Sequence, residues 1–359
     1  MRLNMGTKPS YALISDLHLH NWQAFSSVRS SGMNSRLYGL ISEILRCALS
    51  LKKAGGNTMY VAGDVFHVRG SIAPSVLNPV ISAFKQVIDL GIKVRLIAGN
   101  HDLEGKHSTA LSSAVTALEG IGVCVCHETS VFNDDNVVMI PWFDSLDELR
   151  AEIGEVTIAE KGLYAHYDLI IHAPLNGVIT GLPDHGLSTD EIAKWGFKRV
   201  FAGHHHNHKD CGQGVYSIGA IAHHTWSDVD SKAGYLFVDD DVRWIKSSLP
   251  EFVDIHSEMT EADAELVANG NFVRVKVQDK KMTTVEGIRD WLTGAGAKGV
   301  IVQPVRQASN KRDAVITASI SAGASLEQSV SEYVLVTFDK SLMGEINLAS
   351  QKVLARANI

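Results

Sequence analysis

The chain has 359 residues, of which 45% are hydrophobic and 20% charged, so it can bury a full core and lacks the composition of a disordered protein. Its formal net charge of −7 excludes a globally basic nucleic-acid binder, although phosphate groups can still be bound through metals and a local basic patch. No apolar run approaches the ~20 residues of a membrane span, and no signal-peptide pattern precedes the first predicted strand. With only four cysteines, which fit a reducing compartment, we expect a cytoplasmic protein without membrane contact.

Short apolar runs alternate with amphipathic segments over the first 240 residues. The runs are bounded by Gly, Asn or Asp and have the length of strands that are buried on both faces. Two of the intervening segments, 37–51 and 76–88, repeat apolar residues at helical spacing. This pattern predicts a layered α/β domain with a partly parallel sheet. The predicted strands are 11–15, 58–62, 94–98, 122–126, 136–140, 168–172 and 199–203.

The pattern changes from about residue 256. An apolar run at 271–277, an amphipathic segment at 283–292 and a second run at 298–305 predict a compact β-α-β unit. The end of the chain has one apolar helical face, which either packs on this unit or binds a partner. The predicted parts are a main domain at 1–255, a small β-α-β domain at 256–310 and a helical tail at 311–359.

Residue types that bind metals recur at or just after the carboxyl ends of predicted strands, where sites assemble in α/β sheets. Carboxylate, amide and imidazole groups together suit Mn²⁺, Fe²⁺ or Zn²⁺ better than Ca²⁺ or Mg²⁺, which prefer all-oxygen ligands. D-x-H or GD alone is usually ordinary turn chemistry, and GNHD alone is moderately informative. The five motifs in this order predict a site for two metal ions. The motifs are SDLH at 15–18, GDVFH at 63–67, GNHD at 99–102, His172, and GHHH at 203–206.

A pair of metal ions ~3.5–4 Å apart can clamp the attacking and leaving oxygens of a phosphoryl transfer. His101 stands beside Asn100 and is not needed as a ligand, so it is the candidate for protonating the leaving oxygen. Asp102 is predicted to fix the tautomer of His101. The sequence therefore predicts a phosphoester hydrolase.

The ordered motifs resemble those of the calcineurin-like metallophosphoesterases over residues 10–240. The resemblance implies a β-sandwich flanked by helices and a pair of divalent ions. We expect these ions to be Mn²⁺, with Fe²⁺, Zn²⁺ or Mg²⁺ as alternatives. It also implies that His101 is catalytic. The implied ligands are Asp16, His18 and His206 for one ion, Asn100, His172 and His204 for the other, and Asp64 as the bridge between them.

Within this family, the GDVFH motif with His67 is similar to that of the SbcD-type DNA repair nucleases, whereas serine/threonine phosphatases carry an Asp-Arg pair after GD. In the nucleases this histidine helps to position the phosphate or the DNA strand, so His67 is a third candidate catalytic residue. The segment IPWF at 140–143 resembles phage recombination nucleases of the same group. The resemblance implies DNA as substrate, the small domain as a cap, and a tail that binds an SbcC-type coiled-coil ATPase, with a homodimer as a further assembly.

The expected function is metal-dependent exonuclease and single-strand endonuclease activity in DNA repair, recombination or phage DNA metabolism. One alternative is a phosphatase or small-molecule phosphodiesterase on the same fold, which would leave the segment 256–310 unexplained. A second alternative is a scaffold that binds proteins without a metal. Such a protein would have lost metal-ligand residues, whereas all seven predicted ligands are present in this sequence. Basic loop residues could contact DNA phosphates or be solvated charges: Arg29, Arg36, Arg69 and Lys106.

Overall fold

The computed structural model describes residues 11–106, 110–159, 163–277 and 282–304, together with Ile346 and residues 348–350. The chain divides into two compact units, one of residues 1–276 with 280–303 and one of residues 277–279 with 304–359. Apart from Ile346 and residues 348–350, which are helical, the predicted tail at 311–359 lies outside the described residues. No helix in the described part of the chain is both long and apolar enough to cross a membrane.

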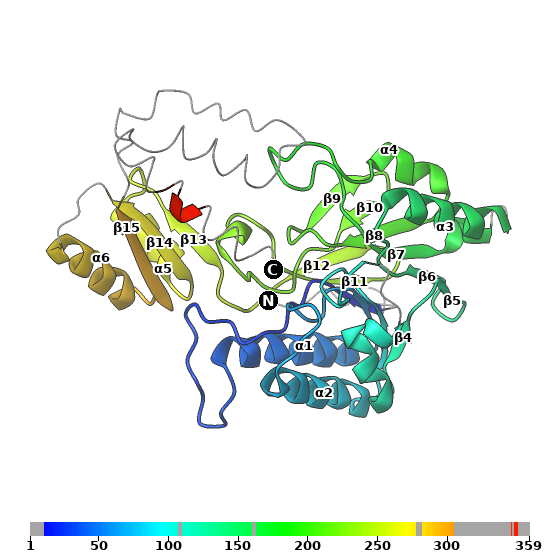
Figure 1. Cartoon of the computed structure of the whole chain (residues 1–359), viewed down its shortest axis with the longest axis horizontal. Helices are drawn as coiled ribbons and strands as arrows, with labels where there is room; N and C mark the ends of the chain where they lie inside the picture. Colours follow the sequence, from blue (N-terminus) through cyan, green and yellow to red (C-terminus); the bar gives the residue numbers. More distant parts are fainter. Residues whose placement is uncertain are drawn as a thin grey trace. The chain divides into compact units, whose positions relative to one another are not determined.

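The first of two large sheets has six strands (Figure 1). These strands are β1 (Tyr11–Ile14), β2 (Thr58–Ala62), β3 (Lys93–Ile97), β4 (Cys124–Cys126), β11 (Gly234–Val238) and β12 (Val242–Lys246). The strand order is β12-β11-β1-β2-β3-β4. The strands β1 to β4 pair in parallel, whereas β11 pairs antiparallel with both β1 and β12. Every residue of β1 and β2 is buried, which explains their unbroken apolar sequences.

The second large sheet also has six strands. They are β5 (Ser130–Phe132), β6 (Val137–Ile140), β7 (Asp168–His172), β8 (Arg199–Gly203), β9 (Lys209–Gly212) and β10 (Val215–Ser217). The order is β5-β6-β7-β8-β10-β9, with parallel pairing in the middle and antiparallel pairing at both edges. The strands predicted at 168–172 and 199–203 have the predicted bounds.

Helices cover the outer faces of the two sheets, and a shared apolar layer fills the space between them. Leu13, Tyr60, Ile170 and Phe201 are among the residues of that inner layer. A second apolar core lies between the first sheet and two helices, and a third lies between the second sheet and two other helices. These helices are α1 (Ser35–Lys53) and α2 (Pro74–Asp89), then α3 (Leu146–Ala159) and α4 (Thr189–Ile192). The predicted fold class, a β-sandwich flanked by helices, is confirmed.

A third sheet has the order β13-β14-β15. Its strands are β13 (Phe252–Ile255), β14 (Phe272–Val277) and β15 (Gly299–Pro304). The helix α5 (Glu261–Ala268) connects the first two strands, and α6 (Met282–Gly294) connects the last two. The predicted β-α-β unit is thus present as β14-α6-β15. It is preceded by β13, which lies before the boundary expected at residue 256 and pairs in parallel with β14. The sequence FVDI is too short to show a strand period, so this strand was not predicted. The division into a main domain and a cap remains a proposal.

Candidate metal centre

The predicted ligands come together at the carboxyl ends of five strands, β1, β2, β3, β7 and β8. His172 is the last residue of β7, and the others lie in the loops that follow the other four strands. The ligand atoms of Asp16, His18 and His206 all lie within 4.8 Å of one another, and so do those of Asp16, Asp64 and His172. The structure therefore places the predicted residues in one cluster.

Asp64 lies between two groups of imidazole and amide donors. Its Oδ2 is 3.6 Å from Nε2 of His18 and 3.5 Å from Nε2 of His172. On the first side, Nε2 of His18 is 3.1 Å from Nε2 of His206. On the second side, Oδ1 of Asn100 is 3.2 Å from Nε2 of His172. It is also 3.1 Å from Nδ1 of His204. Asp64 therefore has further metal-binding side chains on both sides of its carboxylate.

The chemistry of the donor set fits divalent cations. Burial and the neighbouring His172 lower the pKa of His204 to about 3, so its ring is neutral and can offer a lone pair. Burial raises the pKa of Asp64, but His172 and His18 outweigh it and hold this pKa well below its usual range. Burial lowers the pKa of His172, while Asp64 raises it to about 9, and a bound cation would take the place of that proton.

The backbone of the cluster is held in conformations that side chains rarely adopt. The φ angles are 49° at Asp16, 41° at His18, 53° at Asp64 and 96° at His204. These are four of the eight non-glycine residues with positive φ in the described part of the chain. Such conformations cost about 1–3 kcal/mol each and concentrate at functional sites. The surrounding fold therefore stabilises strained loops in this cluster.

Two glycines allow the loops to approach each other. A Cβ atom at Gly63 would lie 2.4 Å from Nδ1 of His172, and one at Gly99 would lie 2.2 Å from Oδ1 of Asp64. Neither distance is sterically allowed, since both are far shorter than any van der Waals contact. The glycines of the GD and GNHD motifs are therefore required for the packing of the cluster.

His101 lies beside this cluster, and one of its ring nitrogens is hydrogen-bonded to the backbone. Its backbone N–H donates to Oδ1 of Asp64 at 2.8 Å. Its Nδ1 is 2.8 Å from the carbonyl oxygen of His67, so Nδ1–H is the donor and Nε2 is left for other chemistry. The ring meets that of His18 edge-on, with 4.9 Å between centroids.

The predicted role of Asp102 is wrong. Its buried carboxylate accepts hydrogen bonds from the backbone N–H groups of Gly99 at 2.9 Å, Phe66 at 2.9 Å and Val65 at 3.2 Å. It therefore ties the loop after β3 to the loop after β2, and the carbonyl of His67 occupies the place at His101 that we expected Asp102 to take. Burial and the charge of Asp64 raise the pKa of Asp102 to about 7.

His67 lies at the edge of the cluster. Its ring stacks on that of His101 at a centroid distance of 5.6 Å and an interplanar angle of 10°. Its Nδ1 is 3.3 Å from Nδ1 of His18, and the ligand atoms of His18, His67 and His101 form a third group within 4.8 Å. Burial and the neighbouring His101 lower the pKa of His67 to about 4, so the ring is neutral.

Asp228 is a residue of the centre that sequence reasoning missed. The residue is only 3% exposed. One oxygen accepts from Nδ1 of His206 at 2.7 Å, and the other accepts from the backbone N–H groups of His224 and Thr225. His224 in turn donates from Nε2 to the carbonyl of Asp16 at 2.9 Å. The available signal was the sequence TWSD, a T-x-x-D capping box that begins a short turn of helix.

Arg36 supports the same loop and is not available to DNA as a free charge. Its guanidinium donates to the carbonyls of His224 at 2.8 Å and His223 at 3.2 Å. Burial lowers its pKa to about 10. The loop that holds Asp228 is therefore held by hydrogen bonds from Arg36 as well as by those to His206 and Asp16.

The contact between Asp228 and His206 leads to a prediction for the Asp228→Asn variant. A carboxylate behind a ligating histidine orients the ring and raises its basicity, and losing such a partner typically weakens metal affinity roughly 10- to 100-fold. We expect a loss of this size for Mn²⁺, measured by titration calorimetry. Asp230→Asn, at an exposed position two residues away, is the control and should bind as the unmodified protein does. Unchanged affinity in Asp228→Asn would show that this contact does not act on metal binding.

Comparisons with known proteins bear on the chemistry of this centre. The family model of the calcineurin-like phosphoesterases matches residues 9–256. Exonuclease subunit 1 of Enterobacteria phage T4 is 26% identical over 207 residues, which are 56% of this chain and 58% of the relative. The chain thus spans less than two thirds of that relative's length.

Two solved structures that the chain matches have low sequence identity and low TM-scores. A dimetal phosphatase from Danio rerio is 11% identical with a TM-score of 0.38, over 65% of this chain and 94% of that one. The nuclease MPE of Pseudomonas putida is 17% identical with a TM-score of 0.28, over 56% of this chain and 62% of that one.

Proposed function

Since the chain belongs to the calcineurin-like phosphoesterase family, we propose that it is a metal-dependent DNA phosphodiesterase of the SbcD type. It acts as an exonuclease and single-strand endonuclease in DNA repair, recombination or phage DNA metabolism. The observation that carries the proposal is the position of Asp64 between two sets of metal-binding side chains, with His101 and His67 beside them. The phage relative, whose name is that of an exonuclease subunit, supports DNA as the substrate.

Members of this family depend on two metal ions, and the side chains of the cluster fit such a pair. When bound, two divalent ions supply charge stabilisation for the attacking and leaving oxygens of phosphoryl transfer. We propose Mn²⁺, with Fe²⁺, Zn²⁺ or Mg²⁺ as alternatives. The proposed ligands are Asp16, His18 and His206 for one ion, Asn100, His172 and His204 for the other, and Asp64 for both.

The residues around the proposed metal pair have separate tasks. Asp228 and the carbonyl of Ala62 accept Nδ1–H from His206 and His172, so each ring directs Nε2 inward. The carbonyl of His67 does the same for His101. In its protonated form, His101 can then donate Nε2–H to the leaving sugar oxygen. The backbone N–H of His101 holds the Asp64 carboxylate in place at the same time.

The function is tested by incubating the full chain and Mn²⁺ with linear duplex DNA, single-stranded DNA and p-nitrophenyl phosphate in parallel. We expect cleavage of both DNAs and little release of p-nitrophenol. The opposite pattern would support the alternative, a phosphatase or small-molecule phosphodiesterase on the same fold.

His67 allows a sharper prediction about the substrate. A polymer end must be turned into the site, whereas a small diester can enter without help. We therefore expect His67→Ser to reduce cleavage of duplex ends far more than hydrolysis of bis(p-nitrophenyl) phosphate, by an order of magnitude or more in the ratio of rates. The exposed His166 provides the control His166→Ser, which should leave the ratio as it is. An unchanged ratio in His67→Ser would show that His67 does not distinguish duplex DNA from a small diester.

Partners and location are part of the proposal. The relative's name denotes a subunit, which supports an assembly with a second protein. We propose an SbcC-type coiled-coil ATPase as that protein, a homodimer as the simpler assembly, and the cytoplasm of a bacterium or of a phage-infected host as the location. Size-exclusion chromatography with light scattering, with and without the ATPase, distinguishes the assemblies.

A further inference from the structure

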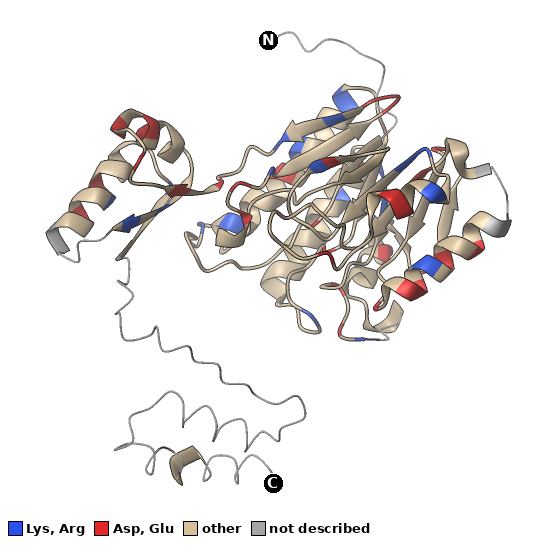
Figure 2. Ribbon diagram, turned by 90° about the horizontal axis from the view of Figure 1, so that it is seen from above, with Lys and Arg blue, Asp and Glu red and all other residues tan. Residues whose placement is uncertain are grey.

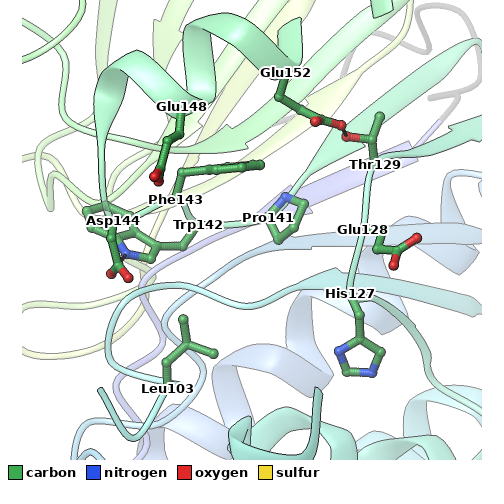
Figure 3. A pocket seen from close by; sticks show the side chains of 10 residues that line it. All are labelled: Leu103, His127, Glu128, Thr129, Pro141, Trp142, Phe143, Asp144, Glu148 and Glu152. Atoms are coloured by element: carbon green, nitrogen blue, oxygen red, sulfur yellow. Dashed lines mark hydrogen bonds between the residues drawn. The ribbon is translucent and has the colours of Figure 1, made fainter. Parts of the chain in front are cut away.

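A cavity of about 420 Å³ lies beside the candidate metal centre and shares Trp142 with it (Figure 3). The indole stacks on the ring of His204, with centroids 5.5 Å apart and planes 24° apart, and meets His172 edge-on at 5.8 Å. The backbone N–H of Trp142 donates to the carbonyl of Ala98 at the end of β3. The volume lies within the roughly 300–1,000 Å³ of small-molecule sites. A ligand in this cavity would therefore touch the side chain that packs on two proposed metal ligands.

The walls of the cavity combine apolar side chains with the carboxylates of Glu128, Asp144, Glu148 and Glu152. Asp144 and Glu152 accept hydrogen bonds from Trp142 and Thr129, so among the described residues Glu148 and Glu128 are the carboxylates of this cavity that have no partner. Leu103, Pro141 and Phe143 line it together with Trp142, and Figure 3 shows the side chain of Glu148 pointing from its helix toward Phe143. Glu148 belongs to the first turn of α3, a helix marked mainly by acidic residues in Figure 2.

These features select a flat ligand that donates hydrogen bonds. Stacking on an aromatic side chain suits any nucleobase, because every base has a π face. A carboxylate accepts only, so it favours the exocyclic amino groups of adenine, cytosine and guanine. It disfavours thymine, whose ring N3–H lies between two carbonyl oxygens that the carboxylate repels. The negative charge of the carboxylate also repels phosphate groups, so the phosphate of a nucleotide would stay at the metal centre while its base enters the cavity.

We propose that this cavity binds the unpaired nucleobase next to the reacting phosphate, with a preference for bases that carry an exocyclic amino group. The proposal rests on the phosphodiesterase activity assigned above. Trp142 provides the stacking surface and Glu148 the hydrogen-bond acceptor. A base must leave its pair to enter, so single strands and frayed ends are the substrates that use this site.

The test uses free deoxynucleoside 5′-monophosphates as inhibitors of bis(p-nitrophenyl) phosphate hydrolysis by the full chain with Mn²⁺. In the unmodified protein, dAMP and dCMP should inhibit at concentrations about 10-fold lower than dTMP, because a hydrogen bond to a charged group is worth that factor. Glu148→Gln, whose amide both donates and accepts, should remove the preference. Asp147→Asn makes the same change on the neighbouring residue of α3, which does not line the cavity, and should keep it.

Trp142 is tested separately because it also contacts His204. Trp142→Ala should weaken inhibition by all the nucleotides by roughly 10-fold or more, whereas Trp142→Phe should retain most of it. Elemental analysis of both variants distinguishes this effect from a loss of metal. Weakened inhibition at full metal content supports the stacking surface, and unchanged inhibition by Trp142→Ala overturns it.

The outcomes separate this inference from the proposed function. Equal inhibition by all nucleotides in the unmodified protein, or equal behaviour of Glu148→Gln and Asp147→Asn, overturns the base site even if DNA is cleaved. Selective inhibition without any cleavage of DNA supports the base site and overturns the nuclease, leaving a phosphodiesterase that acts on small nucleotides.

Discussion

Replacing Asp64 by alanine should abolish phosphodiester hydrolysis and remove at least half of the bound metal. Oδ2 of Asp64 lies 3.6 Å from Nε2 of His18 and 3.5 Å from Nε2 of His172, and we propose that the carboxylate serves both ions. Without it, two sets of mainly neutral donors would have to hold two divalent charges close together, which is electrostatically unfavourable. Metal content is measured by elemental analysis after dialysis, alongside DNA cleavage with Mn²⁺.

The exposed Asp89 offers a matched control for this experiment, since Asp89→Ala removes a carboxylate of the same kind from the surface of α2. This variant should keep full activity and metal content. If Asp64→Ala also retained two ions per chain, Asp64 would not be the bridge, and the division of the ligands into two sets would be wrong.

Replacing His101 by alanine should slow turnover about 10²–10⁴-fold, the range for general acid–base catalysis, while both metals stay bound. Alanine retains the backbone N–H that donates to Asp64, so the change removes the imidazole and leaves that support in place. The remaining contacts of the ring are with the carbonyl of His67 and the rings of His18 and His67. Single-turnover rates and elemental analysis are measured on the same preparation.

Two results would contradict this assignment in different ways. Turnover at the normal rate would show that His101 has no part in the chemistry. Loss of metal would show that His101 is itself a ligand, an arrangement that its closeness to His18 and His67 would permit. In that case the proton donor to the leaving oxygen would need to be assigned again.

The buried strands and the residues that follow them were predictable because both leave a local signal. A strand that is covered on both faces, such as β7, needs an unbroken apolar sequence, and a loop that brings Asp64 close to Gly99 needs a glycine there. These constraints act on neighbouring residues, so the motifs appear in the sequence. The ligand cluster could therefore be predicted from five short segments.

Contacts between distant segments left no comparable signal. Asp102 follows His101 in the chain, yet its carboxylate faces the backbone of the loop after β2, because adjacent side chains need not point the same way. Asp228 meets His206 across 22 residues, and only its place in a capping box could have drawn attention to it. Trp142 stacks on His204, 62 positions away, so the cavity beside it could not be predicted.

The most direct test of the account is anomalous diffraction from crystals of the full chain grown with Mn²⁺. We predict two manganese peaks ~3.5–4 Å apart, with the Asp64 carboxylate between them, His206 and His18 beside one peak, and His172 and His204 beside the other. A single peak, or a pair of peaks away from Asp64, would contradict the proposed two-metal centre and the phosphodiesterase mechanism built on it.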